Sequence, residues 1–491
     1  MMINEITIFN ELYTARADLL IALASLALLV IGTMLKTRAI HRVAIAAVTV
    51  LFVTLIMTLQ QDNSDAPITL FNDMIVYDRY GVFMKILVLI GAMAAVMMIV
   101  RDTASHVFGR FESVVLVLLA TLGMSIMVSA NNMLSLYVGV ELQSLALYIL
   151  ASTNRNSLSS SEAGLKYFIL GALSSGFLLF GISLIYGFTG TTSFPLIADI
   201  ILMGQDSTIP MALSVGLVFV LTGLAFKISA VPFHMWTPDV YQGAPSSVAA
   251  FFAMAPKIAA VAVLGRLLFS PFAELQGEWT QILYALSIAS MILGALAGLI
   301  QKNLYRLLAY SSIGNMGFVL LGFIAGGLNG VSATLVYLAI YLVTTAGIFA
   351  LILSVRDKNN VAATNLSDFA GLSKRSPAVS YALAIMLFSM AGIPPLAGFF
   401  AKLFVFKAII INEYYILAIV GMLSSVVAAY YYLKLIKIMF FDQPPATVLY
   451  TVQSSGLLRW VAVPCVAFVV LYILSPDRLV YEATQAALSL N

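Results

Sequence analysis

The sequence predicts an all-α integral membrane protein, and three observations lead to that fold class. Hydrophobic residues make up 62% of the 491 residues and charged residues 10%, whereas a typical soluble domain is about 45–50% apolar and about 25% charged. The mean hydropathy is +1.02. Apolar runs of about 20 residues, the length that a helix needs to cross a bilayer, recur along the whole chain. We therefore expect one membrane domain that covers residues 1–491.

About fourteen apolar runs are expected to form membrane-spanning helices. Residues 1–105 supply the first three, and residues 458–475 supply the last. Because fourteen is an even number, both termini should lie on the same side of the membrane. The expected helices begin near Leu19, Val43, Gly81, Ser113, Ala130, Ala163, Met211, Ser246, Thr280, Leu304, Val331, Ala378, Tyr414 and Arg459.

The distribution of positive charge predicts which side that is. Of the 25 lysines and arginines, fifteen, Arg356 among them, fall on one face of the expected membrane domain, and six, including Lys85 and Arg266, fall on the other. Loops rich in lysine and arginine stay in the cytoplasm. Both termini should therefore lie on the outer side. The net charge of +3 follows from this asymmetry and gives no reason to expect a nucleic acid partner.

Four lysines and one glutamate lie inside runs that are otherwise apolar: Glu141, Lys166, Lys227, Lys257 and Lys402. A charge at the bilayer centre costs about 2.5–3.5 kcal/mol. Five unpartnered charges would therefore cost as much as the whole net stability of a typical fold, about 5–15 kcal/mol. Such residues usually line an ion or proton path inside the protein. Snorkelling or structural ion pairing is the alternative, and it is strongest for Lys166, which lies near a helix end.

Lysine suits a proton path because burial lowers the pKa of an amine and a nearby carboxylate raises it, so a moving neighbour can switch the charge. We hypothesise that Glu141 is the carboxylate that sets the charge of Lys227. Pro256, directly before Lys257, should loosen its helix and let water reach the amine. The alternative for Lys257 is an amine that is hydrogen-bonded to neighbouring carbonyls and has no transport role.

Depth along the helices orders the charged groups into a route. Protons would be taken up near Lys166 or His234 and would leave past Lys402, which lies about two thirds of the way toward the outer face. A lone histidine beside Trp236 can equally be a packing residue, so both roles stay open for His234. Its acidic neighbour Asp239 is expected to cap the start of the next helix.

Two helices are expected to be broken, around Pro232 and around Pro394. In both, small residues precede a proline, which removes a backbone donor and clashes with the preceding turn. The two broken helices enter the membrane from opposite sides, as inverted repeats require. We therefore expect two five-helix repeats over residues 113–269 and 280–440. Ordinary proline kinks without a repeat are the alternative.

The residues present exclude several kinds of chemistry. The single cysteine, Cys465, cannot form a disulfide framework, an iron–sulfur ligand set or a CxxC pair. The sequence contains no glycine-rich nucleotide loop, no paired-histidine metal spacing and no Ser-His-Asp set suited to a membrane core. Any redox chemistry that is coupled to this chain must therefore take place in another subunit.

Three stretches carry a resemblance to a known family. They read Phe-Lys-Ile-Ser-Ala-Val-Pro-Phe-His-Met-Trp-Thr-Pro-Asp over 226–239, Glu-Leu-Gln-Ser-Leu-Ala-Leu-Tyr over 141–148 and Gly-Ile-Pro-Pro-Leu-Ala-Gly-Phe-Phe-Ala-Lys over 392–402. They resemble the antiporter-like subunits of proton-pumping NADH:quinone oxidoreductase, respiratory complex I. The similarity spans essentially the whole chain and is most specific between residues 130 and 410.

The resemblance implies a role for each charged residue. Glu141 and Lys227 would be a charge-switching pair, Lys257 the central relay, Lys402 the exit group and Lys166 a partner on the uptake side. The protein would then carry protons from the cytoplasm to the outer side of a bacterial inner membrane. The driving force would be quinone reduction in other subunits.

The resemblance also implies partners. No cofactor is expected in this chain, because NADH, FMN, iron–sulfur clusters and quinone would be bound by other subunits. The neighbours would be M-type, K-type and J-type membrane-arm subunits and the lipid bilayer. Two alternatives stay open: a subunit of a multi-subunit cation/proton antiporter of the Na+/H+ type, and a structural membrane-arm scaffold whose buried ion pairs carry no protons.

Overall fold

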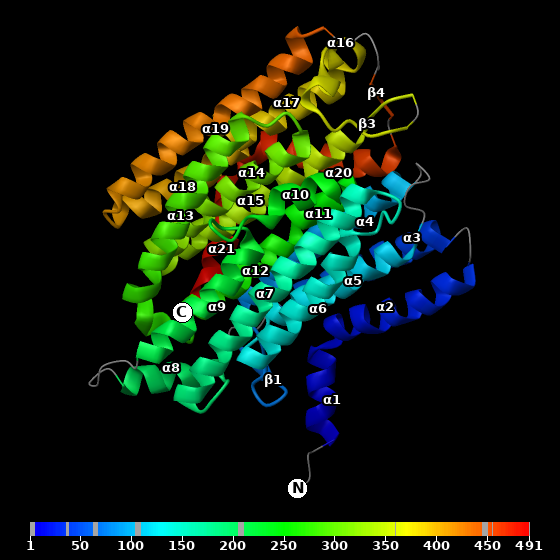
Figure 1. Ribbon diagram of the computed structural model, residues 1–491. Helices are drawn as coiled ribbons and strands as arrows, with labels where there is room; N and C mark the ends of the chain where they lie inside the picture. The colour runs from blue at the N-terminus through cyan, green and yellow to red at the C-terminus, as the bar shows by residue number, and fades with distance from the viewer. Residues whose placement is uncertain are drawn as a thin grey trace.

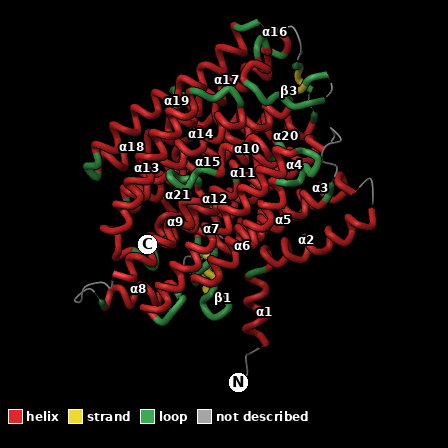
Figure 2. The backbone as a smooth tube through the Cα atoms, viewed as in Figure 1, coloured by secondary structure: helices red, strands yellow, loops and turns green. Residues whose placement is uncertain are grey.

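Helices account for almost all of the described structure (Figure 2). The computed structural model describes residues 5–35, 39–61, 67–103, 110–204, 211–358, 360–443, 450–453 and 455–490. Its first helices are α1 (Glu5–Thr14), α2 (Arg16–Leu35), α3 (Ala39–Gln60), α4 (Arg79–Thr103), α5 (Glu112–Val128), α6 (Met133–Ala151), α7 (Leu158–Thr189), α8 (Phe194–Met203), α9 (Met211–Ile228), α10 (Trp236–Gly243), α11 (Ser246–Ala253) and α12 (Ala255–Phe269).

The second half of the chain continues the helical pattern (Figure 1). Its helices are α13 (Gln276–Leu299), α14 (Leu304–Ala325), α15 (Gly327–Leu353), α16 (Leu372–Arg375), α17 (Pro377–Ala391), α18 (Ala397–Ile411), α19 (Tyr415–Phe441), α20 (Gly456–Leu471) and α21 (Pro476–Leu488). Two short antiparallel ladders complete the described structure. They pair β1 (Ile68–Leu70) with β2 (Ile75–Tyr77) and β3 (Val355–Arg356) with β4 (Thr451–Val452).

The predicted class, an all-helical membrane protein, is confirmed. Helices lie over all of the predicted apolar runs, and among the described residues eleven are long and apolar enough to cross a membrane by length and composition. The shorter apolar helices include α5, α9 and α17. The sequence analysis missed α1, α8 and α21, which are only 10 to 13 residues long and so cannot span a bilayer.

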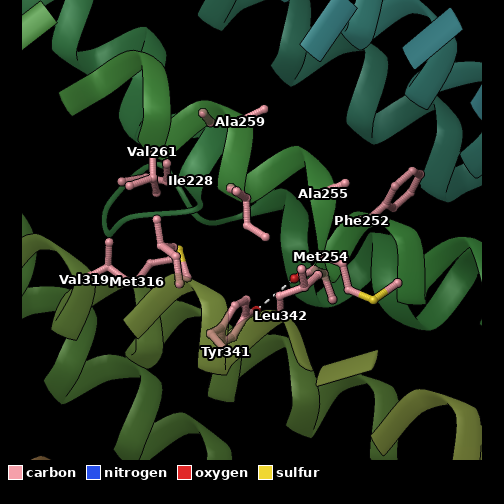
Figure 3. Close-up of a cluster of buried hydrophobic side chains, with 14 of the residues drawn as sticks. Ile228, Phe252, Met254, Ala255, Ala259, Val261, Met316, Val319, Tyr341 and Leu342 are labelled. Carbon is pink, nitrogen blue, oxygen red and sulfur yellow. Dashed lines mark hydrogen bonds between the residues drawn. The ribbon is translucent and has the colours of Figure 1, made fainter. Parts of the chain in front are cut away.

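The buried centre of the molecule is formed by α11, α12, α14 and α15. All of the most apolar window of residues 246–269 is buried, and 94% of the corresponding windows of α14 and α15, against 22% for α2. An apolar helix of a membrane protein can face lipid or other helices; here small side chains such as Ala255 and Ala259 let neighbouring helices approach closely. Figure 3 shows this packing around Met254, with Tyr341 and Leu342 of α15 opposite. Lys257 therefore lies on a helix that is enclosed by other helices.

Both predicted breaks are present. α9 ends at Ile228 before α10 begins at Trp236, and α17 ends at Ala391 before α18 begins at Ala397. Each break frees backbone groups, which must find partners where water is scarce. At the first break the indole N–H of Trp236 donates to the carbonyl of Phe226 at 3.0 Å. One carbonyl that precedes the first break is therefore satisfied inside the protein.

Candidate functional site

Lys227 lies in the last turn of α9 and is buried. Its Nζ donates to the hydroxyl of Ser144 at 2.6 Å and, more weakly, to that of Tyr148 at 3.5 Å. Both acceptors lie on α6, one and two turns after Glu141. The predicted partner Glu141 is thus on the helix that Lys227 contacts.

Glu141 and Lys227 do not form an ion pair. Among the described residues, Glu141 is the carboxylate whose electrostatic attraction reaches Lys227, but Ser144 occupies the hydrogen-bonding position on the amine. The Oε1 atom of Glu141 is buried and has no hydrogen-bond partner within the described structure. An unsatisfied carboxylate oxygen in a buried site is costly. This oxygen is therefore free to take a proton, a water molecule or a closer lysine.

Lys257 is the third residue of α12, and its side chain is 1% exposed. Its Nζ donates to the hydroxyl of Ser312 on α14 at 2.7 Å. Ser312 is also hydrogen-bonded to Tyr341 of α15 at 2.6 Å, and the Tyr341 hydroxyl donates to the carbonyl of Ala253 at 3.0 Å. A hydroxyl carries one proton, so Ser312 must donate to Tyr341. The chain of donors therefore runs from Lys257 through both hydroxyls to the end of α11.

Lys402 lies on α18, and its side chain reaches back to the second break, between α17 and α18. Its Nζ donates to the carbonyls of Met390 and Ala391 at 3.2 and 3.1 Å and to the Ser425 hydroxyl of α19 at 2.7 Å. An ammonium group has three N–H donors, and here all three have an acceptor. Two of the acceptors are the last carbonyls of α17, where the helix dipole favours a cation.

A set of polar side chains separates Lys257 from Lys402, and we name it the α14 polar cluster. Hydrogen bonds join Tyr337 to Asn315 at 2.7 Å and Asn315 to Ser311 at 3.4 Å. Three cavities of about 10, 20 and 10 Å³ are lined by its members, and Lys402 lines two of them. Such volumes are about what one water molecule needs. The cluster consists of Ser311, Ser312, Asn315, Tyr337, Tyr341 and Tyr432.

The sequence analysis missed the α14 polar cluster. Ser311, Ser312 and Asn315 are polar residues within α14, at a spacing that places Ser311 and Asn315 on one face. That spacing is the signal that could have identified them. Serine and asparagine are too common in membrane helices for the pattern alone to specify a site.

Aromatic rings lie between Lys227 and Lys257. The Lys227 amine lies 5.8 Å from the ring centre of Phe226, and the Lys257 amine lies 5.7 Å from that of Tyr241. The ring of Trp236 lies near both of these rings, with its centre 5.6 Å from that of Phe226 and 6.5 Å from that of Tyr241. In the described structure no hydrogen bond connects the two lysines. The hydroxyl of Tyr241 is buried without a partner.

Lys166 differs from the other three lysines because it lies at the protein surface. Its side chain is 43% exposed and pairs with Glu162 at 2.7 Å and with Asp239 at 2.8 Å. Asp239 also pairs with Arg306 of α14 at 2.6 Å. The expected helix cap at Asp239 is wrong, because α10 begins at Trp236 and has no side-chain cap. Asp239 instead bridges α7 and α14, which fits the ion-pair alternative for Lys166.

His234 lies between α9 and α10 and is partly buried. Its Nδ1 atom is buried without a hydrogen-bond partner among the described residues, while its carbonyl accepts from the amide of Thr237 at 2.9 Å. The ring nitrogen is thus available to a proton or a water molecule.

Three charges that the sequence analysis counted on the faces of the membrane domain are buried in ion pairs along α4. The guanidinium of Arg266 binds Asp78 through two hydrogen bonds of 2.7 and 2.8 Å. Arg356 binds Asp102 at 2.7 Å, and Lys85 binds Asp18 at 3.0 Å. Asp102 also accepts from the hydroxyl of Ser247, the second residue of α11, at 3.0 Å. α4 is therefore fastened to both ends of the α11–α12 segment that carries Lys257.

The chain is similar to known proteins over most of its length. Residues 130–428 match the family model described as NADH:quinone oxidoreductase/Mrp antiporter, TM. The chain is 49% identical over 436 residues to NADH-quinone oxidoreductase subunit N of Paramagnetospirillum magneticum, covering 88% of this chain and 89% of that protein. Subunit N 1 of Rhizobium meliloti is 47% identical over 98% of both. A chain of Thermus thermophilus respiratory complex I with bound aureothin superposes with a TM-score of 0.80 at 30% identity, covering 95% of this chain and 98% of that one.

Proposed function

Because the chain belongs to the family of antiporter-like membrane subunits that NADH:quinone oxidoreductases and Mrp antiporters share, we propose that it is the N-type, proton-translocating subunit of a NADH:quinone oxidoreductase. It is thus one subunit of an enzyme complex. The family also includes Mrp antiporters, but the relatives that are 47–49% identical are named for NADH-quinone oxidoreductase subunit N.

One observation carries the proposal at the level of chemistry. Among the described residues, Lys227, Lys257 and Lys402 are buried, yet each donates to hydroxyl or carbonyl oxygens and none forms an ion pair with a carboxylate. A hydroxyl can accept from an ammonium ion or donate to a neutral amine. Each lysine can therefore lose its proton without leaving a buried carboxylate unpaired, which a structural ion pair would not allow.

We propose that protons move along these residues toward the outer side. Glu141 sets the charge of Lys227, Lys257 is the central relay, and the α14 polar cluster carries the proton on to Lys402. The cavities between Lys257 and Lys402 each offer room for about one water molecule. Lys166 and His234 are the proposed uptake groups.

The proposed membrane arrangement has fourteen crossings. α5 and the broken pairs α9–α10 and α17–α18 add three to the eleven candidate spans. Residues 113–269 and 280–440 form the two inverted repeats, each with one broken helix, flanked by the segments 1–105 and 458–475. Both termini then lie on the outer, periplasmic side of a bacterial inner membrane.

The proposed complex supplies the energy for proton transfer and the redox cofactors. Moving one charge against 100 mV costs about 2.3 kcal/mol, so a coupled reaction must drive the transfer. We place NADH, FMN, the iron–sulfur clusters and quinone in partner subunits, with M-type, K-type and J-type subunits as membrane-arm neighbours. Lysine rather than glutamate at Lys402 and the Tyr-Gln-Gly-Ala-Pro stretch over 241–245 favour the N type.

Replacing Glu141 with glutamine is expected to lower NADH-driven proton pumping about tenfold. The reason is that a change of one pKa unit at Lys227 alters the ratio of its charged to its neutral form about tenfold. The measurement is the initial rate of proton uptake into inverted membrane vesicles at equal complex content. Glu112→Gln, at an exposed carboxylate, should leave the rate unchanged. If the two residues act as a pair, Glu141→Gln should add nothing to Lys227→Met. An additive loss, or full pumping in Glu141→Gln, would disprove the pairing.

A further inference from the structure

A groove between three helices remains outside the proposed proton route. It lies between α15, α17 and α20, has a volume of about 670 Å³, and we name it the α20 groove. The three helices can be followed in the upper half of Figure 1, where α20 lies on the side of β3 and β4. A volume of this size is within the range of ligand sites, about 300–1,000 Å³. Small side chains create it: Ala350 of α15, Ala378 and Ala382 of α17, and Ala462 and Ala467 of α20.

The groove is apolar along its length and cationic at one end. Its lining is almost entirely alanine, valine and leucine, and Arg459 is the charged residue among the described lining residues. Arg459 is exposed and makes no ion pair within the described structure. Arg459 also lies in the first turn of α20, where the helix dipole attracts an anion. The groove thus presents one unpaired cation at the end of an apolar channel.

The position of Arg459 matches the level of lipid head groups. The N-terminus of α17, the C-terminus of α15 and the N-terminus of α20 meet at this end of the groove. The neighbouring Trp460 is 76% exposed, and exposed tryptophans collect at the membrane–water interface. The arginine end therefore lies at the membrane surface and the apolar end within the bilayer.

The length of the groove fits one leaflet. From Arg459 to Leu471 the groove follows thirteen residues of α20, and the distance between the first and the last is roughly 18 Å along the helix. One leaflet contributes about 15 Å of hydrocarbon. The length of the groove therefore matches the depth to which one lipid acyl chain reaches.

We propose that the α20 groove binds one acyl chain of an anionic phospholipid, with the lipid phosphate at Arg459. The apolar lining takes the hydrocarbon chain, and the unpaired guanidinium together with the first turn of α20 binds the phosphate. The proposal does not depend on the proton route, because Lys227, Lys257 and Lys402 do not line the groove.

Native mass spectrometry of the purified full chain tests this site. Delipidated protein is titrated with phosphatidylglycerol and, separately, with phosphatidylcholine, and the most tightly retained lipid is counted. The wild-type chain should retain one phosphatidylglycerol molecule in preference to phosphatidylcholine. Arg459→Gln should lower that preference about fivefold, the effect of one basic residue near an anionic lipid. Ala382→Phe, which fills the groove, should abolish retention of both lipids.

Two matched variants serve as controls. Arg155→Gln removes an exposed arginine and Ala172→Phe enlarges an exposed α7 alanine, both outside the groove, and neither should change lipid retention. Equal retention in the wild-type chain, Arg459→Gln and Ala382→Phe would overturn the proposal. It would also fail if Ala382→Phe lowered assembly of the complex while lipid retention stayed the same, because the groove would then hold a partner helix.

Discussion

Replacing Lys257 with methionine is expected to lower quinone-linked proton pumping at least tenfold, which corresponds to about 1.4 kcal/mol or more in activation free energy, in a complex that still assembles. The amine is the titratable group at the centre of the proposed route, and methionine fills a similar volume without one. Because Lys257 donates to Ser312 and has no carboxylate partner in the described structure, its removal leaves no unpaired buried charge. Stability should therefore stay the same or rise.

Pumping and thermal stability must be measured together, because the scaffold alternative makes the opposite prediction for both. If Lys257 is only structural, Lys257→Met should pump normally and unfold at a lower temperature. Lys302→Met is the matched control, since Lys302 is exposed, and it should change neither quantity. Lys227→Met provides a second test, with the same loss of pumping expected. Normal proton uptake in both variants would remove the basis for a lysine relay.

The burial of three lysines could be predicted from the sequence, but their hydrogen-bond partners could not. A charge within an apolar run cannot face lipid at acceptable cost, and Lys227, Lys257 and Lys402 all point into the protein. The acceptors Ser144 and Ser312 lie 83 and 55 residues away along the chain. No local pattern links such distant residues, so their pairing follows only from helix packing.

The role of Asp239 shows a different limit. The capping prediction assumed that the helix after the break begins close to Asp239, but the broken segment resumes at Trp236. A shift of four residues, from an N-cap at Asp239 to one at Met235, places Asp239 inside the helix, where it pairs with Lys166 of α7 and Arg306 of α14. Helix boundaries near breaks depend on contacts such as the hydrogen bond from the Trp236 indole to the Phe226 carbonyl, which local sequence rules do not contain.

The buried arginines show what a count of charged residues leaves out. A count of lysine and arginine predicts orientation but treats every charge near a helix end as exposed. Arg266 is in the last turn of α12. It therefore still belongs to the face of the membrane domain on which it was counted, although its side chain is buried. Its partner Asp78 lies in a segment 188 residues earlier. The sequence therefore predicted its approximate depth without revealing its contact.

Both members of the Arg266–Asp78 ion pair also form hydrogen bonds with the backbone. Besides the two bonds to Asp78, the Nε atom of Arg266 donates to the carbonyl of Val128 at 3.1 Å. Asp78 also accepts from the amide of Gly81 at 2.7 Å and so caps the start of α4. Arg266 follows Lys257 by nine residues on α12, roughly 14 Å along the helix. The pair thus fixes one end of the helix that carries the central lysine.

Replacing Arg266 with methionine is expected to lower the free energy of unfolding by about 3–5 kcal/mol, because Asp78 would remain buried without its cation. SDS titration of the full chain, followed by circular dichroism, measures the change. Adding Asp78→Asn should restore most of the stability, since asparagine carries no charge and can still accept from Gly81. Arg155→Met, at an exposed site, should have little effect. If the double variant were as unstable as Arg266→Met alone, packing rather than the unpaired carboxylate would account for the loss.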